Sequence, residues 1–511
     1  MKFNWRNPFH LLGLVLAWRV MLLVFTAQPI PANDAFIFDG GVANWLHGGR
    51  YVIPCMSVAY PISGTQIFSL YPPVYQLPLV LWMSVFGTSA LAAMAMHLFF
   101  FATAATLTVL IVQSFFPKLN GVALPVLLLF AINFNDRPED LAHIFGLASL
   151  LLVGRQISGA GRSGRRAAGI VLVLFLALYT SVIVGAYYFG VGFLACAAAW
   201  WWGTRRWIYF LPYVATALLF AAVTATIARV EPLWWHGFLE NATKQSAVGG
   251  FHLPHVLDLV KLVRNAPVFL VTLGLLPWLL PRCRQMPADQ RAWLYLMAGI
   301  FAMGWMLLFV DMTLLSPDYV LFVLFSQVLL ATGLLALAKT FSTGATVWLR
   351  RLLWGCVLLV SVRAIGMSTW GAACAWKNSY GSAQTLLRRE LAPFVAAPEP
   401  VVISSQFLYG ARQLGVLHPI HSDWYYDRAL TAPDADWEGF LRLRPTRLVL
   451  GQFDFYRSYV PLLARLRQHP ERVTVTVRDL AGVRPPDAIP ALSRVVQHIS
   501  WAPVIVDLEW K

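Results

Sequence analysis

Charged residues are scarce in this 511-residue sequence. They make up 12% of the chain, whereas a soluble protein carries roughly a quarter. Hydrophobic residues make up 58% of the chain, and the mean hydropathy is +0.63. Apolar stretches long enough to cross a bilayer of about 30 Å recur between Phe9 and Trp370. The composition excludes an ordinary soluble protein and predicts a polytopic membrane protein.

Cysteine is also scarce, and several common functional motifs are missing. The five cysteines form no CxxC pair and no ligand cluster, so a zinc-finger type of site is excluded. Residues 371–511 contain no GxGxxG, P-loop or GxSxG motif. We therefore expect this last region to bind or brace rather than to catalyse.

The net charge of +15 comes largely from basic clusters between apolar stretches, at residues 155–166, 205–206, 282–284 and 350–351. Such clusters mark cytoplasmic loops of membrane proteins. They do not combine into one surface of basic and aromatic residues, as nucleic-acid binding would require. The pattern predicts a cytoplasmic N-terminus and no nucleic-acid partner. High Arg and Trp usage with few lysines near the C-terminus favours the bacterial inner membrane.

The positions of the basic loops predict eleven transmembrane helices. They are expected near residues 9–28, 90–113, 120–134, 139–154, 168–185, 186–203, 207–228, 266–281, 291–310, 317–338 and 352–370. The apolar segment 72–87 is not counted, because counting it would place the basic loop 155–166 outside. Pro72, Pro73 and Pro78 also disfavour a spanning helix there. We expect a re-entrant or interfacial helix within a long first outer loop, residues 29–89.

The composition changes after Trp370. Short β-branched runs at 401–404, 447–451, 473–477 and 504–508 alternate with helical patterns, which is typical of a small α/β domain. The expected fold is an all-α polytopic membrane domain, residues 1–370, followed by an α/β domain, residues 371–511. An odd number of spans places this second domain outside, in the periplasm.

Three stretches resemble motifs of the integral-membrane glycosyltransferases of the C type (GT-C). "FDGGVANWLHGGRYVIP" (38–54) is similar to their first-loop acidic motif, and "YPPVYQLPLVLWMSVFG" (71–87) to the Pro-Pro-x-Tyr segment that follows it. "NDRPEDLAHIFGLASLLLV" (135–153) resembles their second-loop acidic motif. The family includes aminoarabinose transferases, protein O-mannosyltransferases and oligosaccharyltransferase catalytic subunits. The recognisable motifs lie within the first 155 residues.

The resemblance implies that a sugar moves from a polyprenyl-phosphate-linked donor to a glycan, lipid or protein acceptor at the outer face of the bilayer. In these enzymes the first-loop acid acts on the acceptor, and by position this role carries over to Asp39. Second-loop acids contribute to the same site, and Asp140 and Asp136 are the best matches. Inverting transfer from a phosphate leaving group needs a base near the incoming hydroxyl group, which agrees with this assignment.

Further candidate substrate-binding residues lie in the outer loops. They are Asp34, Glu139, Arg137, Tyr71, Lys244, His252 and His255. Some relatives carry a basic residue just before the Pro-Pro segment, but Leu70 and Tyr71 stand there in this chain. The partner of the donor phosphate is then expected among Lys244, Lys261, Arg264 and Arg363, or is a divalent cation. Neither acidic loop carries a DxD motif, so dependence on Mg²⁺ or Mn²⁺ stays open.

Structural roles compete with these assignments. Asp39 could cap the helix that follows it, and Asp34 could serve in a turn. At least one of Asp136, Glu139 and Asp140 is expected to cap the fourth span, where "RPED" marks a helix start. His252 and His255 could be interfacial, and Lys244 a solvated loop charge. Arg19, in the middle of the first span, is expected to have a structural partner inside the bundle.

Two other functional classes remain as alternatives. A transporter or lipid flippase predicts ionisable residues near the midplane and spans broken by Gly or Pro, whereas most charge here lies at the ends of spans. A non-catalytic scaffold for envelope glycan assembly predicts the same fold without dependence on Asp39.

Overall fold

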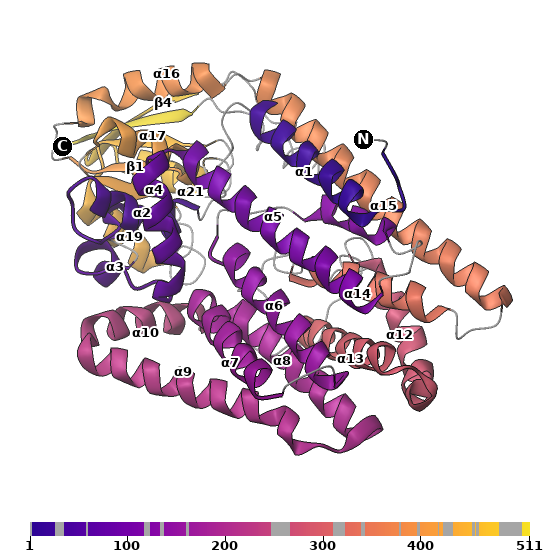
Figure 1. Cartoon of the computed structure of the whole chain (residues 1–511). Helices are drawn as coiled ribbons and strands as arrows, with labels where there is room; N and C mark the ends of the chain where they lie inside the picture. Colours follow the sequence, from indigo (N-terminus) through magenta and orange to yellow (C-terminus); the bar gives the residue numbers. More distant parts are fainter. Residues whose placement is uncertain are drawn as a thin grey trace. The chain divides into compact units, whose positions relative to one another are not determined.

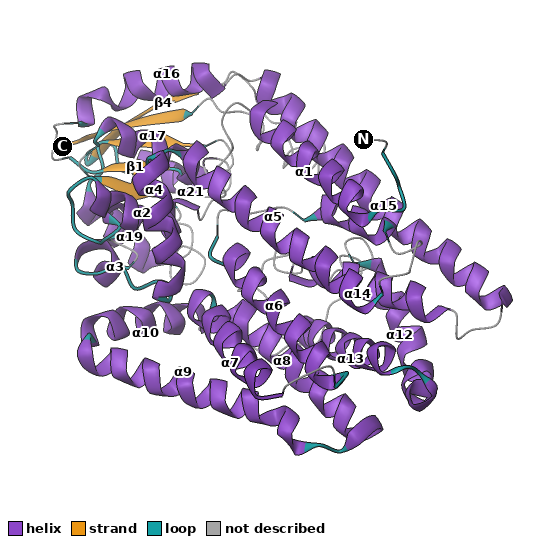
Figure 2. Ribbon diagram, in the orientation of Figure 1, coloured by secondary structure: helices purple, strands orange, loops and turns teal. Residues whose placement is uncertain are grey.

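The computed structural model describes most of the chain. The described residues are 3–25, 35–57, 60–116, 123–132, 137–159, 163–246, 266–309, 322–338, 343–377, 380–395, 399–416, 418–422, 433–451, 455, 459–479 and 503–511. Helices dominate up to residue 395, and strands occur only after it among these residues (Figure 2). This order agrees with the predicted fold class.

Five helices of the described chain are long and apolar enough to cross a membrane. They are Leu91–Phe115, Glu139–Ile157, Val182–Gly203, Trp207–Val230 and Gly344–Thr369. Shorter apolar helices cover Pro8–Val24, Pro73–Phe86 and Phe325–Leu337. These elements fall within or next to predicted spans and the predicted segment 72–87. The number of eleven spans stays a prediction.

The principal helices have the following bounds: α1 Pro8–Phe25, α2 Ala35–Leu46, α4 Gln76–Phe86, α5 Ala90–Phe115, α6 Glu139–Ile157, α7 Ser163–Thr180, α8 Val182–Ala199, α9 Leu211–Val230, α10 Pro232–Ser246, α12 Pro267–Leu279, α13 Ala288–Phe309, α14 Phe322–Leu337, α15 Thr343–Lys377 and α16 Tyr380–Leu391.

Contacts divide the chain into two compact units. The first comprises Met1–Val20, Tyr71–Leu77 and His97–Met367, and the second comprises Met21–Leu70, Pro78–Met96 and Ser368–Lys511. The expected division at residues 370 and 371 stays a prediction.

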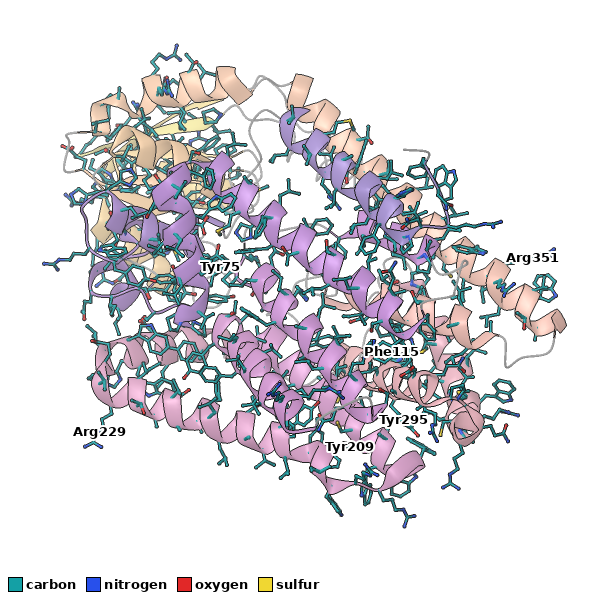
Figure 3. All side chains as sticks on the ribbon, in the orientation of Figure 1. Tyr75, Phe115, Tyr209, Arg229, Tyr295 and Arg351 are labelled. Atoms are coloured by element: carbon teal, nitrogen blue, oxygen red, sulfur yellow. The ribbon has the colours of Figure 1, made fainter. Side chains whose placement is uncertain are left out.

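Helices α6, α7, α8 and α13 pack together in the first unit (Figure 1). Small residues allow close approach of their backbones, as is common between membrane helices. A Cβ atom built on Gly299 of α13 would lie 2.2 Å from the carbonyl oxygen of Val191 on α8. A buried aromatic pair adds to this core. Phe115 lies within the helical region (Figure 3), and its ring centre is 5.2 Å from that of Trp293. The bundle around α8 is therefore fixed by both small and large side chains.

The predicted span 120–134 contains a 3₁₀ helix, η3 (Leu124–Ala131), in its described part. Eight residues are too few to cross a bilayer as a 3₁₀ helix, which rises about 2 Å per residue. Arg19 of α1 is buried and donates hydrogen bonds to the carbonyl oxygens of Phe130 (2.7 Å) and Ile132 at the end of η3. Its guanidinium also lies 5.6 Å from the ring centre of Phe101. The predicted structural role of Arg19 is confirmed.

Residues of the segment 29–89, predicted to form the first outer loop, contribute to the second unit. Besides α2, they form η1 (Pro54–Met56) and the short helix α3 (Pro61–Thr65). Helix α17 (Ser405–Leu414), from the C-terminal region, packs against α2. Arg412 of α17 donates a 2.7 Å hydrogen bond to the carbonyl oxygen of Thr88. Most described residues of this predicted loop thus share the second unit with the C-terminal region, whereas Tyr71–Leu77 belongs to the first unit.

The C-terminal region contains a five-stranded sheet with the order β2-β1-β3-β5-β4. Its strands are β1 Val401–Ile403, β2 Pro419–His421, β3 Arg447–Leu450, β4 Val473–Asp479 and β5 Val504–Trp510. Strands β2, β1 and β3 are parallel, and β5 is antiparallel to β3 and β4. Helices α17, α19 (Pro433–Leu443) and α21 (Val460–Arg467) lie between strands in sequence. The predicted α/β pattern is confirmed, and β2 is an additional strand.

Four charged side chains join this sheet to α16. Glu390 Oε2 accepts hydrogen bonds from Arg478 Nη2 at 2.9 Å and from Arg447 Nη1 at 3.4 Å. Both arginines also bind Asp507 of β5, at 3.0 Å and 2.6 Å. Glu390 is 5% exposed, so this network is anchored on a buried carboxylate.

Candidate active site

Two adjacent acids begin helix α6. Glu139 and Asp140 lie in its first turn, and Pro138 occupies the N-cap position. The positive end of the helix dipole favours carboxylates at this place. The prediction of a helix with acids in its first turn is confirmed, whereas neither described acid is the cap residue.

Glu139 is buried and receives hydrogen bonds from two hydroxyl groups. Its Oε1 atom accepts from Tyr71 Oη at 3.1 Å and from Ser181 Oγ at 3.5 Å. The side chain is 4% exposed, and its Oε2 atom has no hydrogen-bond partner among the described residues. Burying a carboxylate costs free energy unless donors compensate it. Tyr71 and Ser181 therefore contribute to keeping Glu139 in place.

Asp140 is linked to a buried histidine. Its Oδ2 atom lies 3.0 Å from His97 Nδ1, and His97 Nε2 lies 2.9 Å from Tyr75 Oη. The charges of Glu139 and Arg137 also act on the Asp140 carboxyl group. Sequence reasoning missed His97, although a histidine inside an apolar span is itself a signal of a buried partner.

The segment Tyr71–Tyr75 supplies both tyrosines. Pro72 is the N-cap of the short 3₁₀ helix η2 (Pro73–Tyr75), and Pro73 begins it. Proline fixes φ near −65°, so the two prolines restrict the backbone between the tyrosines. The Pro-Pro-x-Tyr segment thus holds one tyrosine on Glu139 and the other on the histidine that binds Asp140.

Asp39 belongs to the second unit and lies inside helix α2, four residues after its start at Ala35. It therefore does not cap this helix, and the capping alternative is wrong. The Asp39 side chain has no exposed surface. A Cβ atom on Gly40 would lie 3.2 Å from Ile53, and one on Gly41 would lie 3.2 Å from Phe68. The two glycines therefore allow apolar side chains to approach the helix next to the carboxylate.

The structure describes only some of the other candidates. Asp34, Asp136, His252, His255, Lys261 and Arg264 lie outside the described residues. The backbone of Lys244 belongs to α10, and Arg363 is an exposed residue of α15. Arg137, Glu139, Tyr71 and Asp140 are brought together in the first unit. The described part of the chain contains no group of three His, Cys, Asp or Glu residues that could hold a metal ion.

Solved structures of one protein resemble nearly the whole chain. ArnT from Cupriavidus metallidurans bound to undecaprenyl phosphate matches with a TM-score of 0.52 and 13% identity, over 97% of this chain and 98% of that chain. ArnT in the apo state matches with a TM-score of 0.53 and 13% identity, over 97% of each chain. ArnT is an aminoarabinose transferase of the GT-C superfamily. This chain has the fold of ArnT.

The fold shared with ArnT extends over both the apolar helices and the C-terminal sheet, because almost all of each chain is covered. This likeness confirms the fold that the first 155 residues predict. No protein-family model and no curated protein sequence matches the chain.

Proposed function

We propose that this chain is a membrane glycosyltransferase that uses a polyprenyl-phosphate-linked sugar as donor. The observation that carries the proposal is the GT-C fold over nearly the full length of ArnT, one structure of which holds undecaprenyl phosphate. Five membrane-length helices agree with a lipid-linked substrate. The acceptor is a glycan, lipid or protein at the outer face of a bacterial inner membrane, with the N-terminus cytoplasmic and the C-terminal domain periplasmic.

We assign the base to Asp39. The acceptor hydroxyl group gives its proton to the Asp39 carboxylate, and its oxygen forms a bond to the anomeric carbon of the sugar. The bond between that carbon and the phosphate oxygen breaks, and polyprenyl phosphate leaves with the electron pair. The anomeric configuration is inverted. Complete burial of a carboxylate is costly, which supports a chemical role for Asp39.

The acid pair of α6 is assigned to substrate binding in the same reaction. Asp140 is partly accessible, with 14% of its side chain exposed, whereas Glu139 is held by Tyr71 and Ser181. Arg137 adds a positive charge next to these acids. The pair therefore offers hydrogen-bond acceptors for the hydroxyl groups of a sugar.

The leaving phosphate needs compensation of its negative charge. We assign this role to basic residues of the outer side, with Lys244 first, and Asp34, His252 and His255 remain candidates for substrate contacts. A divalent cation, Mg²⁺ or Mn²⁺, is the alternative. Chelation by EDTA should leave transfer unchanged if side chains hold the phosphate. Loss of transfer that Mg²⁺ or Mn²⁺ restores would assign the role to the cation.

A lipid analysis of the host tests the proposal. In a strain that lacks the gene, the polyprenyl-phosphate-linked sugar should accumulate, and wild-type complementation should remove it. Complementation with Asp39→Asn should leave the donor in place, whereas Asp289→Asn, at an exposed acid that begins α13, should act like the wild type. Mass spectrometry of the extracted lipid then names the sugar.

A strain that lacks a flippase would also accumulate a lipid-linked sugar. A second experiment therefore distinguishes a glycosyltransferase from a flippase. Purified protein in liposomes is supplied with the extracted lipid and with a membrane extract as acceptor. An enzyme releases free polyprenyl phosphate, whereas a flippase only changes the leaflet in which the intact lipid lies. A scaffold does neither, and Asp39→Asn would then behave like the wild type.

A further inference from the structure

Two hydrogen bonds connect Asp140 through His97 to Tyr75, and all three residues belong to the first unit. His97 and Tyr75 have no exposed surface, whereas 14% of the Asp140 side chain is exposed. The chain of side chains therefore has one accessible end, the carboxyl group. Such a buried connection matters because each hydrogen bond limits how the next side chain can turn.

The chemistry of the three groups gives the two hydrogen bonds a common direction. A neutral imidazole has one N–H donor and one acceptor nitrogen. An ionised Asp140 carboxylate can only accept hydrogen bonds. His97 Nδ1 must therefore carry the hydrogen and donate a hydrogen bond to Oδ2. His97 Nε2 is then the acceptor, and the phenol of Tyr75 donates to it. The direction runs from Tyr75 to His97 to Asp140.

We propose that His97 and Tyr75 are positioning residues for Asp140. They hold its Oδ2 atom and keep the carboxyl group ionised, so that the carboxylate can accept a hydrogen bond from a sugar hydroxyl group. This inference rests on the proposed glycosyltransferase function. Among the described residues, Glu139, Arg137 and His97 are the charged or titratable groups that act on Asp140.

The position of Tyr75 supports this role over simple packing. Tyr75 is the last residue of η2 and follows Pro72 and Pro73, which restrict its backbone. Four residues earlier, Tyr71 binds Glu139. One short segment therefore serves both acids of α6, which a tyrosine buried only for its apolar area would not require.

Two substitutions of His97 separate its two hydrogen bonds. The amide nitrogen of His97→Asn takes the place of Nδ1 and can still donate to Asp140, but it cannot reach Tyr75. The amide of His97→Gln takes the place of Nε2 and loses Asp140. Removing a hydrogen bond to a charged group corresponds to about a 10- to 100-fold change. We expect such a loss of kcat/KM for His97→Gln and a loss below about 10-fold for His97→Asn.

The assay is sugar transfer by the full-length protein in liposomes between pH 4 and 8. For His97→Gln the acidic limb of the kcat/KM profile should move to higher pH, because the Asp140 carboxylate loses its donor. Tyr75→Phe should cause a smaller shift in the same direction, and the exposed His418→Asn should cause none. Equal losses for His97→Asn and His97→Gln with an unmoved pH profile would overturn the inference.

A spectroscopic measurement tests the direction of these two hydrogen bonds independently of enzymatic activity. Magic-angle-spinning NMR of the wild type with ¹⁵N-labelled histidine, compared with His97→Asn, identifies the His97 signals. A neutral ring protonated on Nδ1 is expected, and Tyr75→Phe should shift the Nε2 signal. A ring protonated on Nε2 would overturn the inference, even in an active enzyme. The expected tautomer in a protein that transfers no sugar would instead contradict the proposed function.

Discussion

Replacing Glu390 by glutamine should weaken the C-terminal sheet by about 1–2 kcal/mol. Breaking a fully buried ion pair costs about 3–5 kcal/mol, and an exposed pair contributes up to about 1 kcal/mol. Glu390 is buried, but the side chains of Arg447 and Arg478 are 18% and 38% exposed. Water therefore screens part of the attraction, which places the cost between these limits. The glutamine keeps the shape of the side chain and removes its charge.

Hydrogen exchange measured by mass spectrometry on the full-length protein is the assay. A cost of 1–2 kcal/mol corresponds to about 5- to 30-fold faster exchange through local opening. The effect should appear in peptides from β3 and β5, because Arg447 and Asp507 of the network lie on these strands. Glu509→Gln, at an exposed position of β5, is the matched control and should leave exchange unchanged.

The deficit of Glu390→Gln should depend on pH. Burial by itself raises the pKa of Glu390, but hydrogen bonds from Arg478 and Arg389 and the charges of Arg478 and Arg447 lower it below its usual value. A depressed pKa contributes stability above the unfolded-state value of about 4.3, and this stability is lost as the pH falls through the folded-state pKa. Protection factors of the variant and the wild type should therefore differ at pH 7 and converge below about pH 4. Equal protection at pH 7 for Glu390→Gln and Glu509→Gln would refute the reasoning.

Two further substitutions test the packing of the first unit. Gly299→Ala would place a Cβ atom against the backbone of Val191 and should lower the thermal unfolding midpoint by about 2–5 °C, as overpacking does. Gly355→Ala is the control and should change the midpoint little, because a Cβ atom there would meet no neighbouring atom within 4 Å. Equal midpoints for Gly299→Ala and Gly355→Ala would show that the helices can separate freely. Tyr71→Phe removes a donor from the buried Glu139 and should cost about 1–3 kcal/mol in denaturant unfolding, and an unchanged midpoint would show that this hydrogen bond is not needed.

The apolar helices could be predicted because an apolar stretch long enough to cross a membrane is a strong local signal in the sequence. Helices α5 and α6 lie close to the ranges expected from the sequence. The interior of segment 120–134 was harder to predict, because hydropathy does not distinguish an α-helix from the 3₁₀ helix η3. Helix α15 begins at Thr343, before the expected start at residue 352, because charged residues interrupt the hydropathy signal without ending the helix. Its basic pair, Arg350 and Arg351, thus lies inside the helix.

Among the polar residues of the site, only the position of the acids could be predicted from the sequence. The stretch "RPED" carries a local helix-start signal, so Glu139 and Asp140 could be placed in a first turn. His97 could not be connected to them, because its partners Tyr75 and Asp140 lie 22 and 43 residues away along the chain. For the same reason the sequence could suggest that Tyr71 binds substrate but not that its hydroxyl group reaches Glu139. Hydrogen bonds of this kind depend on tertiary packing and leave no periodic pattern.

Native mass spectrometry of Asp39→Asn, purified in mild detergent from its own host, tests the central claim most directly. A variant without its base should bind the donor and fail to use it. The account predicts a bound mass equal to a polyprenyl phosphate plus one sugar, stronger in Asp39→Asn than in the wild type. Bulk phospholipid alone on both proteins would contradict the claim that this chain is a glycosyltransferase.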